Sequence, residues 1–385
     1  MPNDETAEEP AGEQRPLRQI LYYDGTIGDL YRIYLVNLLL TIVTLGIWRF
    51  WGITRLRRYV WSRTSMMEDR FEYDGTGLQL FLSFLLAGLI LVVMVFAAAI
   101  ASLLLRHTHP RLVIVPIGLV EFIIIVLALG APFAAQRYRL GHTMWRGIRG
   151  GMEGSAIQYG LRSVAYYILA GITLYQLLPW ATLRLRERLI DASFLGDLQF
   201  HARGRARELY LVFLATFAGV IILGIVVAGA VFLLDASGMH AMAASMHRSS
   251  HAPFDPELSR AIRHAIYWII AGYVVFFVGG ALISCVYTAS FWRHLLRHTN
   301  AGNIRFGSAV KARAVFMLVA GNFLILVFTL GLGYPFIIQR NMRFFTFNLL
   351  ASGGPDVATL RQSDRPVPTL GEGMFQQLDG GAGFL

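Results

Sequence analysis

Seven long apolar segments constrain this sequence of 385 residues more than any other feature. Each holds at least about 20 residues, the length that an α-helix needs to cross about 30 Å of hydrocarbon. The chain is 55% hydrophobic and only 15% charged, and the charges cluster between these segments. We therefore predict an all-α fold, a polytopic bundle of transmembrane helices. The segments cover residues 30–51, 78–105, 112–133, 157–180, 209–234, 265–290 and 314–338.

Polar stretches flank this apolar region on both sides. Residues 1–20 carry five acidic side chains and lack the basic-then-apolar run of a signal peptide. Residues 351–385 are rich in glycine, proline and polar side chains. We expect a disordered N-terminal tail at 1–20, a transmembrane domain at 21–350 and a polar C-terminal tail at 351–385.

The formal net charge is +10, and arginines at the ends of apolar segments supply most of it. In a soluble protein such an excess would favour nucleic acid as a partner. Here the arginines have aromatic neighbours at the expected bilayer surface, so we expect anionic lipid head groups and no nucleic acid. The single cysteine, Cys285, excludes a disulfide within the chain.

Three of the apolar segments end in the same pattern. A Thr-Leu pair precedes a ring residue by seven positions and an arginine by eleven. The three copies are Thr44, Trp51 and Arg55; Thr173, Trp180 and Arg184; and Thr329, Phe336 and Arg340. A pattern that recurs at fixed spacing indicates an internal structural repeat.

The repeat extends into five arginine-rich stretches, which we call elbows. They end in a hydroxyl residue, namely Thr64, Thr143, Ser193, Thr299 and Thr346, six positions after an arginine or, in the third, after Glu187. A phenylalanine follows seven positions later in three copies, and a glycine follows eleven positions later in three. We expect each hydroxyl at a helix end or turn, and the alternating residues 71–75 as a short extended piece.

The elbows are predicted to lie at head-group depth, with aromatic rings in the interface and arginines on phosphate. The expected lipid-contacting residues are Arg55, Arg57, Arg58, Arg137, Arg184, Arg293, Arg340, Trp51 and Trp180.

The sidedness of the elbows leaves two topologies open. Arginine-rich loops favour the cytoplasmic face, and all five elbows qualify. If all five are cytoplasmic, the first, fourth and seventh segments must enter the membrane and return as re-entrant segments. If instead they span simply, one elbow faces the other side.

The sequence resembles the YjgN-like family of bacterial inner-membrane proteins of unknown function. The likeness is carried by the first elbow with its flanks (residues 22–61), by RFEYDGTGLQLF at 70–81, by RHTNAGNIRF at 297–306 and by the tail GEGMFQQLDGGAGF at 371–384. The resemblance implies a multi-pass protein of a bacterial inner membrane and supplies no catalytic or ligand residues. The third elbow departs from the pattern with RLRERLIDAS.

Four polar residues inside the apolar segments are candidates for a path through the membrane. Glu121 lies near the middle of the third segment, where a carboxyl group usually faces a cavity or a partner. Asn37, Tyr166 and Asn322 occupy equivalent positions, seven before the threonine of each Thr-Leu pair. Such residues line the path in repeat-built transporters, or they hold helices together by hydrogen bonds.

Little in the sequence points to catalysis. No nucleotide-binding, zinc-protease or serine-hydrolase motif occurs, so we expect neither an enzyme nor a cofactor. His240, His247 and His251 are weak candidates for a soft metal ion. We predict a transporter or channel-like protein for a small solute or ion. The alternative is a non-catalytic scaffold or an organiser that binds anionic lipid. The oligomeric state stays open.

Overall fold

The computed structural model describes residues 16–234, 256–353 and 361–362. The chain forms two compact units. Unit 1 comprises Met1–Gly204, Arg293–Ala309 and Asn322–Leu385, and unit 2 comprises Arg205–Trp292 and Val310–Gly321. The weak metal candidates His240, His247 and His251 fall outside the described residues, as does most of both expected tails.

All eleven strands in the described residues belong to unit 1 and form one antiparallel sheet, so the all-α prediction is wrong. The strands have only two to five residues each and lie in the polar elbows, where hydrophobic periodicity gives little signal. The strands are β1 (Arg18–Gln19), β2 (Leu21–Tyr23), β3 (Thr64–Met66), β4 (Asp69–Tyr73), β5 (Thr143–Trp145), β6 (Ile148–Met152), β7 (Ser193–Leu195), β8 (Leu198–Ala202), β9 (Thr299–Ala301), β10 (Ile304–Ser308) and β11 (Leu349–Ser352).

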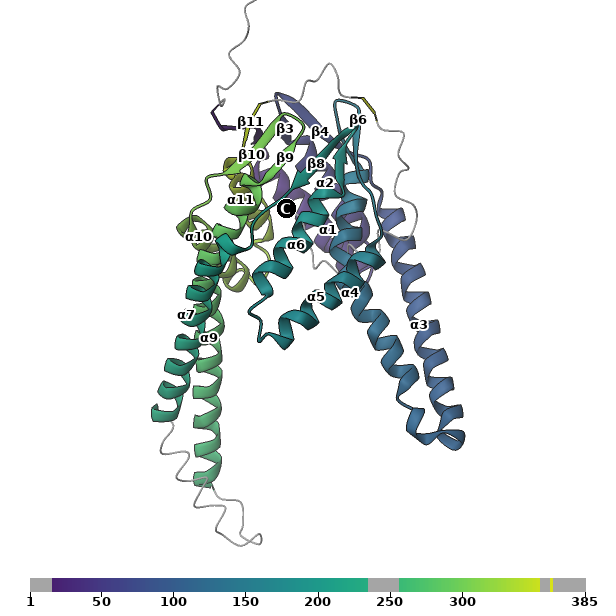
Figure 1. Ribbon diagram of the computed structural model, residues 1–385, viewed down its shortest axis with the longest axis vertical. Helices are drawn as coiled ribbons and strands as arrows, with labels where there is room; N and C mark the ends of the chain where they lie inside the picture. The colour runs from purple at the N-terminus through teal and green to yellow at the C-terminus, as the bar shows by residue number, and fades with distance from the viewer. Residues whose placement is uncertain (1–15, 235–255, 354–360, 363–385) are drawn as a thin grey trace, which may run out of the picture. The chain divides into compact units, whose positions relative to one another are not determined.

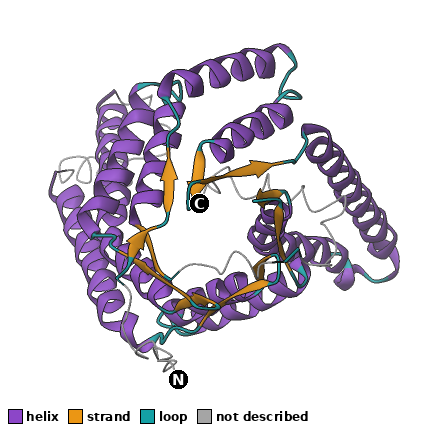
Figure 2. Cartoon of the chain, turned by 90° about the horizontal axis from the view of Figure 1, so that it is seen from above, coloured by secondary structure: helices purple, strands orange, loops and turns teal. Residues whose placement is uncertain are grey.

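The sheet closes on itself through the N-terminal strands (Figure 2). Its order runs β1-β11-β10-β9-β8-β7-β6-β5-β4-β3-β2, so β1 and β2 stand at its two ends. These two strands are consecutive in the chain and are separated by Ile20 alone. One extended segment therefore pairs with β11 through its first half and with β3 through its second. A sheet that closes in this way leaves no free edge for pairing with other chains.

Five copies of one pairing register make up this ring. The last residue of an incoming strand stands opposite the first residue of the strand that follows the next elbow. The five pairs are Tyr23–Thr64, Tyr73–Thr143, Met152–Ser193, Ala202–Thr299 and Ser308–Leu349. The N-terminal segment supplies the incoming strand of the first pair through β2. Through β1 it also pairs with β11, where the other elbows have the second strand of their own β-hairpin, so the repeat is permuted around the ring.

The first, fourth and seventh apolar segments form helical hairpins in place of single helices. Each begins with a 17-residue helix, about 25 Å long, and a shorter helix leads back to the sheet. The first helices are α1 (Ile27–Val43), α5 (Ala156–Ile172) and α10 (Ala312–Phe328). The second helices are α2 (Arg49–Ser62), α6 (Leu178–Asp191) and α11 (Tyr334–Asn348).

The Thr-Leu pair forms the turn of every helical hairpin. The threonine hydroxyl accepts the N–H group four residues on, at 2.9 Å for Thr44, 3.3 Å for Thr173 and 2.7 Å for Thr329. The leucine that follows is left-handed in each copy, with φ between 49° and 51°. The repeated pattern therefore encodes a helix reversal, which combines a hydroxyl cap with a left-handed residue.

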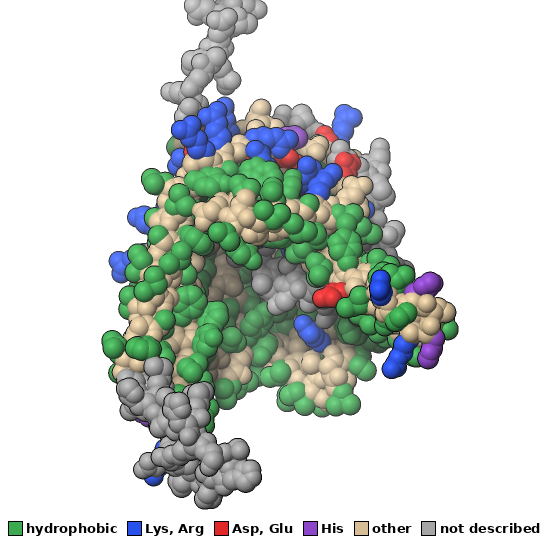
Figure 3. Space-filling view, turned by 60° about the horizontal axis from the view of Figure 1, so that its bottom comes forward, with side chains coloured by type: hydrophobic (Ala, Val, Ile, Leu, Met, Phe, Trp, Pro, Cys, Tyr) green, Lys and Arg blue, Asp and Glu red, His purple; other side chains and the backbone are tan. Residues whose placement is uncertain are grey.

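Four helices in the described residues are long and apolar enough to cross a membrane. They are α3 (Gly77–Thr108), η1 (Pro110–Leu112) with α4 (Val115–Gly141), α7 (Arg207–Leu234), and α9 (Pro256–Arg297) from Ile262 onward. Figure 1 shows α3 beside α4 and α7 beside α9 as two long pairs. Hydrophobic side chains cover most of the helical surface in view, as a membrane-embedded surface requires (Figure 3).

Candidate functional site

The hydroxyl residues of the elbows connect each elbow helix to its strand. In four copies the side chain donates to the backbone oxygen four residues earlier, at 2.7–2.8 Å. Thr64, Thr143, Ser193 and Thr299 are each the first residue of a strand. Thr346 makes the same bond at 2.9 Å, but it lies within α11, and Leu349 begins the strand. The predicted helix-end role is confirmed for the four, and the fifth copy is displaced by three residues.

A second repeated contact joins each elbow helix to the glycine that follows the two strands after that elbow. Arg58 donates to the carbonyl of Gly75 at 3.0 Å, and Arg137 donates to that of Gly154 at 2.9 Å. The third elbow reverses the polarity, because Glu187 accepts the backbone N–H of Gly204 at 2.6 Å. The deviation RLRERLIDAS therefore preserves the contact and exchanges its donor for an acceptor.

The expected lipid-contacting residues differ in exposure. Arg55 is exposed and lies over the ring of Trp48, 5.1 Å from its centroid. Arg184 pairs with Glu187 at 2.7 Å. Arg293, Arg340, Trp51 and Trp180 are half-buried. Arg57 stands apart, because its side chain is 4% exposed and packs inside unit 1.

The three equivalent polar residues each contact the second helix of their own hairpin. Asn37 donates to the carbonyl of Gly52 in α2 at 3.4 Å and accepts the indole N–H of Trp48, the residue before α2, at 3.2 Å. Asn322 donates to the side chain of Asn341 at 2.8 Å. Tyr166 packs against Trp180 with ring centroids 4.8 Å apart. The structural equivalence expected from the spacing is present, and in all three copies these contacts hold the two helices of a hairpin together.

Glu121 lies elsewhere, on the seventh residue of α4, and its side chain is exposed. The structure thus places it nearer the end of α4 that is away from the sheet. No contact in the described residues joins it to Asn37, Tyr166 or Asn322.

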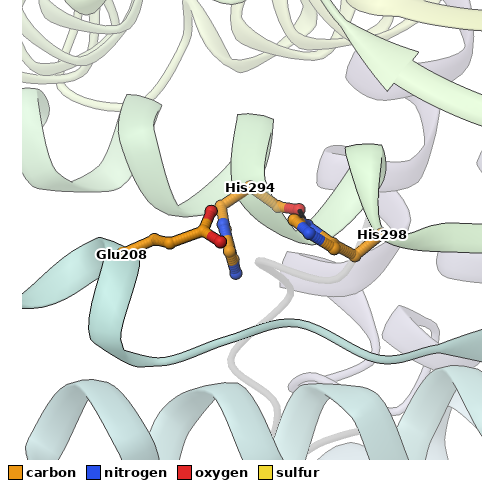
Figure 4. A group of neighbouring side chains, drawn as sticks. All are labelled: Glu208, His294 and His298. Atoms are coloured by element: carbon orange, nitrogen blue, oxygen red, sulfur yellow. Dashed lines mark hydrogen bonds between the residues drawn. The ribbon is translucent and has the colours of Figure 1, made fainter.

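Two histidines at the end of α9 form the clearest pair of metal-ligand side chains within unit 1. The rings of His294 and His298 lie 4.3 Å apart, and Nδ1 of His298 lies 2.8 Å from the backbone oxygen of His294. Figure 4 shows them one helical turn apart, drawn with Glu208 of unit 2. Two imidazoles fall short of the three or four protein ligands typical of zinc.

A cavity of about 700 Å³ lies at the seam where the ring closes. Its lining comes from β1, β2, β3, β11 and the β3–β4 turn, and includes Arg18, Gln19, Tyr22, Ser65 and Glu68. Because β1 and β2 form one extended segment that completes both ends of the sheet here, the shape of the cavity depends on the position of this segment.

Buried polar groups gather beneath the first elbow. Nε and Nη1 of Arg57 are buried and have no hydrogen-bond partner among the described residues. The phenols of Tyr73 and of Tyr138 in α4 lie near this guanidinium group, and the two phenols share a side-chain hydrogen bond. The sequence indicated Arg57 only as an interfacial arginine, and it held no signal for the burial of this side chain.

Comparisons with known proteins show the family of the chain. The chain matches the family described as "Bacterial protein of unknown function (DUF898)" over residues 18–377. It is 23% identical to inner membrane protein YjgN of Salmonella typhimurium, over 90% of this chain and 92% of that protein. It is 38% identical to inner membrane protein YjgN of Escherichia coli K12 over 61 residues, which is 16% of this chain and 15% of that protein. No solved structure matches the chain. The chain therefore belongs to the DUF898 family of bacterial proteins and is a multi-pass protein of the bacterial inner membrane.

Proposed function

We propose that the protein is a non-catalytic membrane organiser that inserts three helical hairpins into one leaflet and holds anionic lipid at its elbows. The observation that carries this proposal is the reversal of α1, α5 and α10 after 17 residues. Their turns expose leucine, with exposed fractions of 94% for Leu45, 77% for Leu174 and 91% for Leu330. An apolar turn on a short hairpin suits the hydrocarbon of a single leaflet.

The sheet supports placing all five elbows on one side of the membrane. Every elbow leads into a strand of the same sheet, and these strands pair with one another around the ring. A hydrogen-bonded sheet cannot cross the bilayer between its strands, because open strand edges are not tolerated in hydrocarbon. This supports the re-entrant topology, and the arginine content favours the cytoplasmic side for the sheet.

Exposed arginines near the hairpins supply the proposed contact with lipid. Arg49, Arg55 and Arg188 are exposed, and none of them forms a salt bridge within the described residues. A guanidinium group at head-group depth attracts anionic lipid by about 1 kcal/mol. Several such groups on one ring would enrich anionic lipid around the protein.

Native mass spectrometry of the purified protein tests this proposal. The triple variant Arg49→Gln, Arg55→Gln, Arg188→Gln should retain fewer phosphatidylglycerol molecules than the unmodified chain. The matched control is Arg106→Gln, Arg111→Gln, Arg260→Gln, which removes equal charge from exposed positions at helix ends away from the elbows. Equal retention by both triple variants would refute lipid binding at the elbows.

A transporter or channel for a small solute or ion is the second candidate, and the exposed carboxyl group of Glu121 on a spanning helix favours it. Proteoliposomes that contain a pH-sensitive dye would report proton movement. This function predicts a proton flux that Glu121→Gln abolishes. An equal flux in the Gln variant would remove Glu121 from the path.

A further inference from the structure

We propose that Arg57 forms an internal binding site for an oxyanion of the phosphate type, distinct from the exposed arginines of the elbows. Arg57 is the only arginine or lysine among the described residues that is buried. No carboxylate of the described residues pairs with it, and Nε and Nη1 lack any hydrogen-bond partner there. The proposal goes beyond lipid retention at the surface and stands on this burial.

The buried acid of the same ring shows how the fold normally treats an enclosed charge. Glu187 is 3% exposed, and it has both a cationic partner, Arg184, and the N–H donor of Gly204. A buried ion without such compensation is strongly disfavoured. Within the described residues, Arg57 has no carboxylate partner, and its Nε and Nη1 have no hydrogen-bond partner, which points to a counter-ion from outside this part of the chain.

The other elbows have no buried cation at this register. Seven residues before each strand, where the first elbow has Arg57, they carry Gln136, Arg186, Trp292 and Met342. Arg186 is exposed, whereas Met342 is buried, with an exposed fraction of 6%. Apolar packing is therefore sufficient to build this position, and the charge in the first elbow is a local addition.

The chemistry of the site favours an oxyanion over a simple halide. A guanidinium group offers N–H donors in a planar fork that matches the oxygens of phosphate. The phosphate group could come from free phosphate or from a lipid head group, and the test separates these sources.

The test follows the unfolding temperature of the full chain in detergent after exchange into phosphate-free buffer. Inorganic phosphate and short-chain phosphatidylglycerol are added separately. Potassium chloride of equal ionic strength and diacylglycerol serve as the reference additions. We expect a saturable rise in unfolding temperature with at least one phosphate source. A rise with inorganic phosphate alone assigns a free anion, and a rise with phosphatidylglycerol assigns a lipid.

Variants at Arg57 decide whether this residue holds the anion. Arg57→Met, which installs the residue of the fifth elbow, should unfold no lower than the unmodified chain without phosphate and should lose the rise. Arg57→Lys keeps the charge without the fork and should bind at least tenfold more weakly. Arg186→Gln, at the same register, should retain the full rise.

Two results would overturn the site. One is a phosphate response no larger than that of chloride. The other is a response that Arg57→Met and Arg57→Lys both leave intact. The triple elbow variant could retain less lipid and still show the rise in unfolding temperature that depends on Arg57. That result would contradict neither proposal and would show that the surface arginines and the Arg57 site act independently.

Discussion

At the scale of single residues, the elbows reuse one contact with interchangeable chemistry. Arg58 and Arg137 bond a glycine carbonyl, whereas Glu187 bonds a glycine N–H group. Each of these side chains lies six residues before the hydroxyl residue of its elbow and bonds the glycine eleven residues after that hydroxyl. The hydrogen bond at this position is therefore kept, while the sign of the charge is not. Among the three side chains, Glu187 depends most on its hydrogen-bond partners, because its carboxylate is buried.

Glu187→Gln should therefore destabilise the fold by about 2–3 kcal/mol, since a charge-assisted bond is lost and Arg184 loses its carboxylate. Thermal unfolding in detergent measures this loss. Glu72→Gln, an exposed acid on β4, should change the unfolding temperature little. A loss of equal size in both variants would contradict the role given to Glu187.

The phenol of Tyr23 gives a pH dependence of known sign. Burial, and next the neighbouring Tyr59, raise the pKa of Tyr23 well above its usual value. The folded state favours the neutral phenol, so this contribution is present below about pH 10 and is lost as the pH rises beyond it.

Tyr23→Phe should leave stability nearly unchanged at neutral pH, because the buried hydroxyl has no hydrogen-bond partner among the described residues. It should also reduce the loss of stability above about pH 10. Unfolding temperatures across this range are compared with those of Tyr22→Phe, whose ring is 55% exposed. A Phe variant at 23 that loses stability in alkali as the unmodified chain does would refute the assignment.

At the scale of elements, the helical hairpin is encoded by its turn. Gly46 and Gly331 follow the left-handed leucine with φ of 95° and 89°, and Tyr175 takes the same place at 64°. Two successive left-handed residues reverse the helix, and glycine adopts this conformation without strain. The threonine hydroxyl then caps the returning chain.

Gly46→Ala should destabilise the first hairpin by about 1 kcal/mol, because no atom blocks the new Cβ and only the backbone angle is strained. Gly171→Ala in α5 also meets open space, but its backbone is helical. That variant should gain up to about 1 kcal/mol. Opposite shifts in unfolding temperature are expected, and shifts of the same sign would argue against the turn.

Sequence patterns predicted these elements unevenly. The apolar segments located the helices, and the hydroxyl spacing located the elbow ends at Thr64, Thr143, Ser193 and Thr299. The strands were missed apart from residues 71–75, because strands of two to five residues are too short to show a clear period. The sequence could not show which of Arg57 and Arg58 is buried. Adjacent residues of a helix point about 100° apart around its axis, and only tertiary packing decides which one faces inward.

At the scale of the whole ring, closure of the sheet depends on β1 and β2, which no local sequence pattern predicted. β1 and β2 complete the fifth repeat from the opposite end of the chain, and only three-dimensional pairing reveals this permutation. Without β1, the outer edge of β11 would be open to other chains.

Removal of residues 1–19 should therefore lower the unfolding temperature and promote association, whereas removal of residues 1–15 should do neither. Size-exclusion chromatography with light scattering in detergent compares the two truncated chains. A monodisperse species of unchanged mass after loss of β1 would show that this strand does not protect the edge.

The central claim is that all elbows lie on one face of the membrane while three hairpins enter and return. Single cysteines in a Cys285→Ala background test it with a membrane-impermeant maleimide on right-side-out and inside-out vesicles. The positions are Glu68→Cys, Gly147→Cys, Asp197→Cys and Asn303→Cys in the strand turns, and His109→Cys between α3 and α4. We predict that the four turns react only from the cytoplasmic face and that His109→Cys reacts only from the opposite face. Reaction of even one strand turn from the face that labels His109→Cys would contradict the account.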